Sequence, residues 1–309
     1  MSVQPSTTTS NFPVSFTRID LPAGGSQSGN IADSFSQTIY NKELWDARVE
    51  SLKSKLEQEF GFPYCLVSRK TLKTEESKSE EHIILQGLGT KWIKLPPGFV
   101  ADTINNGMSK SEGDFLNNGL IGNFRPLYLT KRKSKLLKGE DGGEIELKNE
   151  PETGTIMEIK GIEIPELYKV VSQKQQGPGE FTLPIRYKVA QRLNVSRYLH
   201  KMAYLTLAVH RSDLFFELPL TSVQELIEQG TPETCRPYSE EFIPGAAPGF
   251  QLDFLMRKQN LTEKVWITNL FVRLKIHHVQ YQFNLIGSQN YFLEEYGNLQ
   301  YYPETISET

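Results

Sequence analysis

The chain has only two cysteines in 309 residues, Cys65 and Cys235, and this count restricts its fold more than any other feature. Two thiols cannot cross-link a disulfide-rich domain, and they cannot supply a four-cysteine zinc site. The fold must therefore be stabilised by the burial of apolar side chains. A hydrophobic content of 38% with 23% charged residues is sufficient for a sizeable core, in one large or two modest domains.

Hydrophobic spacing predicts a helix, two strands and a second helix in the first part of the chain. Asn41 is a suitable N-cap, and apolar residues recur at helical spacing from there to Gly61. Aromatic and β-branched residues at 62 to 69 suit a short strand, and the strand-like run Glu81-His82-Ile83-Ile84-Leu85 suits a second one. The capping box Ser109-Lys110-Ser111-Glu112 predicts the start of the next helix.

The second part of the chain mixes helices with antiparallel strands. A basic run at residues 131 to 138 is followed by a turn at 141 to 143, which predicts a hairpin. Apolar spacing predicts helices over residues 196 to 208 and from 222 to 230. Residues 279 to 285 alternate between apolar and polar types, as in a strand with one buried and one solvated face. The predicted fold class is α+β.

Composition divides the chain into three regions. Residues 1 to 40 are rich in Ser, Thr, Gly and Gln and predict a flexible arm. We expect a module at 41 to 130 and an α+β C-terminal region at 131 to 309. No apolar run approaches the roughly 18 residues of a membrane span, and no secretory signal is evident, so we expect a soluble, cytoplasmic protein without a membrane partner. A net charge of -3 gives no general affinity for nucleic acid.

The most informative span runs from Cys65 to residue 117. It contains in order Cys65-Leu66-Val67-Ser68, Glu81-His82-Ile83-Ile84, a Gly-rich turn at 87 to 89, and Ala101-Asp102-Thr103-Ile104-Asn105-Asn106. Over roughly fifty residues this order and spacing resembles zinc-stapled members of the HNH endonuclease family. In that family a Cys-x-x-Cys knuckle precedes an acidic residue and His-Ile-Ile, and a second Cys-x-x-Cys runs directly into Asn. The resemblance implies a ββα-metal (HNH-like) module within residues 41 to 130.

The sequence departs from the family pattern at the zinc positions. Cys65 is retained, whereas Ser68, Ala101 and Ile104 stand where the other three cysteines would be. One thiolate cannot hold a structural zinc ion, so we expect none. Burial of Ile104 and neighbouring apolar residues is expected to replace the stabilisation that zinc supplies.

The residues that the resemblance assigns to catalysis are all present. It implies that His82 is the general base and that Glu81 and Asn105 hold one divalent metal, with Asn106 as the alternative ligand. An imidazole titrating near neutral pH can take a proton from water. A Mg2+ or Mn2+ ion would neutralise the scissile phosphate of DNA. Because adjacent residues of a regular strand face opposite ways, Glu81 and His82 can share one site only where the strand ends or kinks.

Basic side chains near this module suggest contacts with a phosphate backbone, although a solvated loop explains them equally well. The residues concerned are Lys110, Lys131, Arg132, Lys133 and Lys135. Three hypotheses therefore stand. The first is a metal-dependent DNA endonuclease. The second is a catalytically inactive relative that binds nucleic acid or protein, with the C-terminal region available to a protein partner, and the third is an assembly module without chemistry.

Overall fold

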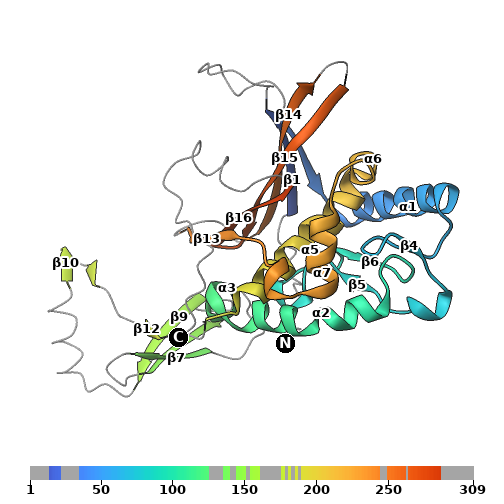
Figure 1. Ribbon diagram of the computed structural model, residues 1–309. Helices are drawn as coiled ribbons and strands as arrows, with labels where there is room; N and C mark the ends of the chain where they lie inside the picture. Colours follow the sequence, from blue (N-terminus) through green and yellow to red (C-terminus); the bar gives the residue numbers. More distant parts are fainter. Residues whose placement is uncertain are drawn as a thin grey trace, which may run out of the picture. The chain divides into compact units, whose positions relative to one another are not determined.

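The computed structural model describes residues 14–21, 35–124, 135–139, 144–150, 154–160, 175–177, 180–181, 185–186, 189–243, 249–261 and 264–286. These residues form helices and mainly antiparallel sheets, which confirms the α+β class (Figure 1). The chain divides into two compact units, one of residues 1–113 with 191–309 and one of residues 114–190. This division differs from the predicted boundary after residue 130, because the first unit takes elements from both parts of the chain.

A six-stranded sheet in the first unit has the order β13-β16-β15-β14-β1-β2. Its strands are β1 (Val14–Leu21), β2 (Phe35–Tyr40), β13 (Tyr238–Phe242), β14 (Phe250–Leu261), β15 (Lys264–Ile276) and β16 (Val279–Ile286). Neighbouring strands are antiparallel except β1 and β14, which are parallel. Two segments of the arm predicted over residues 1 to 40 form β1 and β2.

The helices of this unit largely follow the predicted periodicity. In α1 (Lys42–Glu59), the Asn41 side chain accepts a hydrogen bond from the Leu44 amide at 2.8 Å, which confirms the N-cap. Helix α6 (Ser212–Phe215) is short, and α7 (Thr221–Gln229) ends at Gly230, whose φ of 57° favours glycine. Helix α5 (Arg192–His210) is buried along most of its length and contacts α1, α7 and β16 (Figure 1).

Two small hairpins and a helix occupy the region of the predicted module. Strand β3 (Tyr64–Cys65) pairs with β4 (Lys70–Thr71), and β5 (Glu81–His82) pairs with β6 (Lys94–Leu95) before α2 (Asp102–Asn117). The 3-10 turns η1 (Thr74–Glu76) and η2 (Gln86–Leu88) connect these strands, and η4 (Pro232–Thr234) lies before β13.

Two predicted bounds in this region are corrected. The strand predicted over 81 to 85 ends at His82, and the Leu85 amide donates to the Tyr198 hydroxyl on α5 instead of to a neighbouring strand. The helix predicted to begin at the capping box of residues 109 to 112 begins at Asp102, because the Ala101 carbonyl already accepts helical hydrogen bonds. The box therefore lies inside α2.

The wet face predicted for residues 279 to 285 is also corrected. In β16, Gln282 is 9% exposed and Asn284 is 3% exposed. Arg236, which lies just before β13, donates to the Asn284 carbonyl, so this segment helps to cover the polar residues of the strand. The alternation of apolar and polar residues predicts the strand correctly here. It does not predict that the polar face of the strand is buried.

The second unit contains α3 (Gly119–Phe124) and a four-stranded sheet of order β12-β7-β8-β9. The strands are β7 (Lys135–Gly139), β8 (Glu144–Glu150), β9 (Gly154–Lys160) and β12 (Ile185–Arg186), with β10 (Gln175–Gly177) and β11 (Glu180–Phe181) forming a separate pair. Strands β7 and β8 are antiparallel, which confirms the predicted hairpin.

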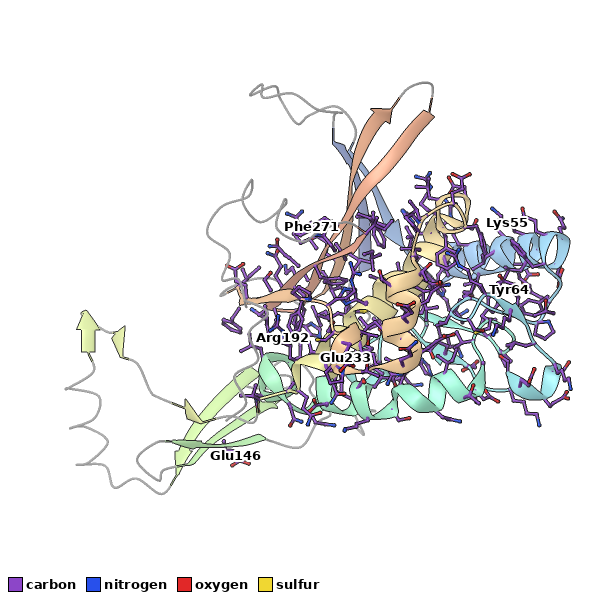
Figure 2. All side chains as sticks on the ribbon, viewed as in Figure 1. Lys55, Tyr64, Glu146, Arg192, Glu233 and Phe271 are labelled. Carbon is purple, nitrogen blue, oxygen red and sulfur yellow. The ribbon has the colours of Figure 1, made fainter. Side chains whose placement is uncertain are left out.

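Apolar side chains fill the first unit around α5 (Figure 2). Trp45 on α1 and Tyr204 on α5 are fully buried, and Phe271 on β15 is 5% exposed. Among the residues that the structure describes, no helix has the length and apolar character needed to cross a membrane.

Candidate functional site

The adjacent residues Glu81 and His82 of β5 lie in different surroundings. Glu81 is 1% exposed, whereas His82 is partly exposed. The pair sits in a regular antiparallel bridge, with Glu81 opposite Leu95 and His82 opposite Lys94. Their side chains therefore leave opposite faces of the strand, as the geometry of a regular strand requires.

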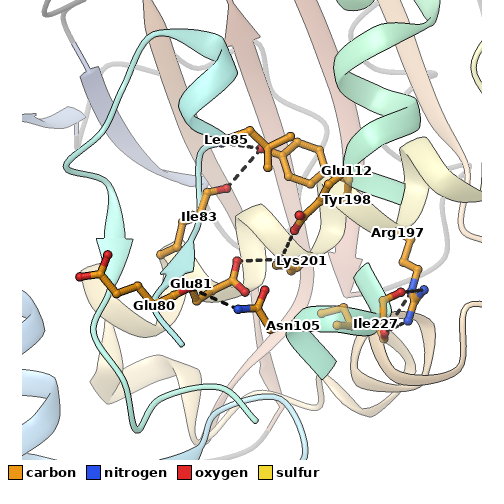
Figure 3. A network of polar contacts seen from close by, with 11 residues as sticks. Glu80, Glu81, Ile83, Leu85, Asn105, Glu112, Arg197, Tyr198, Lys201 and Ile227 are labelled. Atoms are coloured by element: carbon orange, nitrogen blue, oxygen red, sulfur yellow. Dashed lines mark hydrogen bonds and ion pairs between the residues drawn. The ribbon is translucent and has the colours of Figure 1, made fainter. Parts of the chain in front are cut away.

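The Glu81 carboxylate forms an ion pair with Lys201, which comes from the buried helix α5. The Lys201 ammonium lies 2.7 Å from Glu81 Oε1 and also contacts Glu112 on α2 (Figure 3). The side chains of Lys201 and Glu81 are 1% and 2% exposed, and that of Glu112 is 19% exposed. Three elements, β5, α2 and α5, thus meet at one buried cluster of charges, which we call the Lys201 cluster (Glu81, Glu112 and Lys201).

The charges of the Lys201 cluster do not balance when all three groups are ionised. One ammonium faces two carboxylates, which leaves an excess negative charge. Burial raises the pKa of Glu81, and the neighbouring Glu112 charge adds to this, although Lys201 opposes it. Burial disfavours the charged form of Lys201, but the attraction of the two carboxylates outweighs it and raises the pKa of Lys201. Burial and the Glu112 charge thus raise the pKa of Glu81, and the ion pair with Lys201 limits that increase.

Asn105, the second predicted metal ligand, lies beside the start of β5. Its side-chain amide donates to the Glu80 carbonyl at 3.2 Å, on the side of the strand that Lys201 occupies (Figure 3). Asn106 and Lys110 are exposed on α2. The structure thus brings Asn105 close to the chain at Glu81, but it does not bring His82 to the same side.

The His82 imidazole has a different set of neighbours. Its Nε2 atom lies 2.7 Å from the side-chain amide nitrogen of Gln86, and its Nδ1 atom is buried without a hydrogen-bond partner among the described residues. Partial burial lowers the pKa of His82, and the nearby Lys94 charge acts in the same direction, against Glu80. A neutral imidazole can accept a hydrogen bond from Gln86, and this contact occupies the nitrogen that faces away from the backbone.

The surroundings of Glu81 do not fit a divalent metal. The cation at this carboxylate is the Lys201 ammonium, and the deep burial of Glu81 leaves no open side for a phosphate. In the part of the chain that the structure describes, no group of three or more His, Cys, Asp or Glu residues is placed to hold a metal ion. The contact with Lys201 therefore disfavours Glu81 as a metal ligand, whereas the role predicted for Asn105 stays a prediction.

We compared the chain with protein-family models, with curated proteins and with solved structures. None of them matches. The interpretation of the site therefore depends on its own residues and contacts.

The two segments that resemble the zinc knuckles do lie together. The Leu66 amide donates to the Phe99 carbonyl at 2.9 Å, and the Tyr64 amide donates to the Gly98 carbonyl at 2.8 Å. Cys65 is fully buried, and its sulfur accepts a hydrogen bond from the Ser68 amide at 3.4 Å. The first knuckle position thus lies against the chain that leads into Ala101.

Side chains from two helices hold this Cys65–Ser68 turn in place. The Tyr204 hydroxyl on α5 donates to the Leu66 carbonyl at 2.8 Å. The Gln224 side-chain amide on α7 donates to the Val67 carbonyl and to the Tyr204 hydroxyl, both at 3.0 Å. Ile104, expected to clamp the module by burial, is only half-buried. Hydrogen bonds from Tyr204 and Gln224 therefore hold this turn in addition to the apolar burial that was expected to hold it.

Arg197 connects the helices around the Lys201 cluster. Its guanidinium donates to the Gly107 carbonyl on α2 at 2.9 Å and to the Ile227 carbonyl at the end of α7 at 3.0 Å (Figure 3). Carbonyls in the last turn of a helix have no helical partner, so a cation there is favourable. Arg197 thereby ties α2 and α7 to α5, the helix that carries Lys201.

Several residues of the candidate site were not evident in the sequence. The one signal for Lys201 is that it is a charged residue on an otherwise apolar face of a predicted helix, and a fully buried Lys requires a partner. Glu112 stands in the capping-box pattern of residues 109 to 112, and Gln86 and Gln224 belong to no pattern. The predicted contacts Lys131, Arg132 and Lys133 lie outside the described residues, and Lys135 lies in β7.

Proposed function

We propose that this chain is a catalytically inactive relative of the HNH endonucleases that keeps the ββα scaffold for binding. The observation that carries the proposal is the ion pair between Lys201 and Glu81, which occupies the carboxylate that the family resemblance assigns to a metal. The order β5, β6 and α2 and the contact between the two knuckle segments support the scaffold part of the proposal.

Nucleic acid is the partner that the resemblance implies. Lys110 is exposed on α2, and a basic run begins at Lys131. Lysine and arginine side chains bind phosphates without sequence preference, and such binding weakens as salt increases. A protein partner is the alternative, and the net charge of -3 is compatible with it.

The test combines a cleavage assay with a binding assay. Supercoiled plasmid incubated with the purified protein and Mg2+ or Mn2+ is expected to stay intact, with wild type and His82→Ala behaving alike. Fluorescence anisotropy of labelled DNA is expected to show binding that weakens in Lys110→Glu. Nicking by wild type that His82→Ala abolishes would overturn the inactive assignment, and binding unchanged in Lys110→Glu and insensitive to salt would exclude the nucleic-acid partner.

The second candidate function is a metal-dependent DNA endonuclease. The observation that favours it is the lowered pKa of His82, because burial keeps this partly exposed imidazole neutral at neutral pH, as a general base must be. The same plasmid assay decides between the two functions, since only the endonuclease requires nicking that depends on His82.

A further inference from the structure

We propose that the Lys201 ammonium is a built-in cation, fixed in a site that would otherwise take a divalent ion. The inference rests on the proposed function, because it gives the reason why the scaffold does not hydrolyse phosphodiesters. It is tested by ion binding without DNA, so that either proposal can fail separately.

The first step is the composition of the site. Two carboxylates from separate elements, Glu81 on β5 and Glu112 on α2, converge on one ammonium. Carboxylate oxygens are the ligands preferred by Mg2+, Mn2+ and Ca2+. Without Lys201, two negative charges would face each other in a largely buried space, a state that only protonation or another cation could relieve.

The second step is an unused ligand atom inside the site. Oε2 of Glu81 is buried and has no hydrogen-bond partner among the described residues. A buried carboxylate oxygen without a partner costs free energy, and the single charge of Lys201 does not satisfy both carboxylates. A divalent ion would balance the two charges that the ammonium balances only in part.

The third step is that an ion can reach the Lys201 cluster and that the surrounding elements hold its carboxylates. Glu112 is 19% exposed, so one side of the cluster reaches solvent, while Glu81 forms its buried end. Arg197, which donates to the Gly107 carbonyl, and the Ser111 hydroxyl, which donates to the Asn194 side chain at 3.3 Å, connect α2 to α5 in the part of α2 that precedes Glu112. These contacts hold the α2 backbone that carries Glu112, and pairing with β6 holds the β5 backbone that carries Glu81. When the Lys201 side chain is shortened, the vacated length of that side chain provides room for an ion with bound water.

The experiment measures binding of Mn2+ alone to the full-length chain by electron paramagnetic resonance. Lys201→Ala is expected to bind one Mn2+ ion at this cluster, and wild type is expected to bind Mn2+ there at least tenfold more weakly. The matched control Lys201→Ala/Glu112→Gln keeps the shortened side chain and loses one carboxylate, so it is expected to lose at least tenfold in affinity relative to Lys201→Ala.

Thermal unfolding with and without Mn2+ covers the case in which Lys201→Ala folds poorly. An ion that replaces the ammonium must raise the unfolding midpoint of Lys201→Ala and leave that of wild type unchanged. Equal Mn2+ binding by wild type and Lys201→Ala, no binding by a folded Lys201→Ala, or a Lys201→Ala chain that stays unfolded at millimolar Mn2+ would each overturn the proposal.

Discussion

Some buried ionisable side chains of this protein make only one or two polar contacts. His277 is an example at the turn between β15 and β16, where it is 1% exposed and has a φ of 53°. Its Nε2 lies 3.1 Å from the Leu88 carbonyl in η2, the turn that also contains Gln86, the neighbour of His82. One buried imidazole thus connects the large sheet to the loop beside the candidate site.

The stability of the protein is predicted to fall in mild acid because of His277. Burial lowers the pKa of His277 to about 4, with the charges of His278 and Lys275 acting in the same direction. The unfolded chain therefore binds a proton near pH 6.5 that the folded chain resists until about pH 4. The stabilising contribution is complete above pH 6.5 and declines between these values, by roughly 3 kcal/mol for one such group.

Urea denaturation at several pH values measures this effect. His277→Gln is expected to reduce the loss of unfolding free energy between pH 6.5 and 4.5. His278→Gln is the comparison variant and is expected to have the smaller effect, because His278 is half-buried and acts on His277 through its charge. An unchanged pH dependence in His277→Gln would show that the buried imidazole is not responsible.

At the scale of elements, α5 organises the first unit by supplying polar groups as well as apolar ones. Tyr198 and Tyr204 of α5 contact the backbone near β5 and near the Cys65 turn, and Lys201 contacts Glu81 between them. These three residues follow one another at intervals of three along the helix, so they lie on neighbouring turns of one side. The same helix side therefore supports both segments that carry the family resemblance.

Removal of one hydroxyl tests this support. Tyr204→Phe leaves the Leu66 carbonyl without its donor and is expected to lower the free energy of unfolding by about 1–2 kcal/mol. Tyr64→Phe is the matched control, because the Tyr64 hydroxyl has no hydrogen-bond partner among the described residues. The denaturation midpoints of the two variants, measured at constant m-value, give the difference in the free energy of unfolding. Equal effects of the two substitutions would contradict a stabilising hydrogen bond from Tyr204 to Leu66.

Helices and strands could be predicted from the sequence where their apolar spacing and capping residues lie within the element itself. The four buried residues of α1, the Gly230 stop of α7 and the β7–β8 hairpin all depend on residues close in sequence. The predicted end of β5 was wrong because the Leu85 amide donates to Tyr198, a partner far away in the sequence. The predicted start of α2 was wrong for a local reason, since the Ala101 carbonyl already accepts helical hydrogen bonds from Ile104 and Asn105 before the capping-box pattern begins.

At the scale of the whole molecule, the first unit is discontinuous in sequence. Residues 191–309 complete a unit begun by residues 1–113, and residues 114–190 form the other unit. The resemblance predicted a ββα module within residues 41 to 130, which contains Glu81 and Asn105. It did not predict Lys201 as the partner of Glu81, and 120 positions separate residues 81 and 201 in the sequence.

The isolated fragment of residues 41 to 130 is therefore expected to remain unfolded. Without α5 it loses the cation of Glu81, the donor to Leu66 and the apolar surface that covers α1. The fragment is expected to show no cooperative transition in urea, while the full-length chain shows one. A sigmoidal transition of the fragment, together with dispersed amide resonances, would contradict this dependence on α5.

The position of α5 in the sequence also affects how the protein is made. The ribosome synthesises α1, β5 and most of α2 before it reaches the second unit, and α5 emerges only afterwards. During that interval the nascent chain presents the apolar residues of α1 and the carboxylate of Glu81 without their partner helix. Completion of the first unit must therefore wait for the second half of translation, a period in which a chaperone has an uncovered surface to bind.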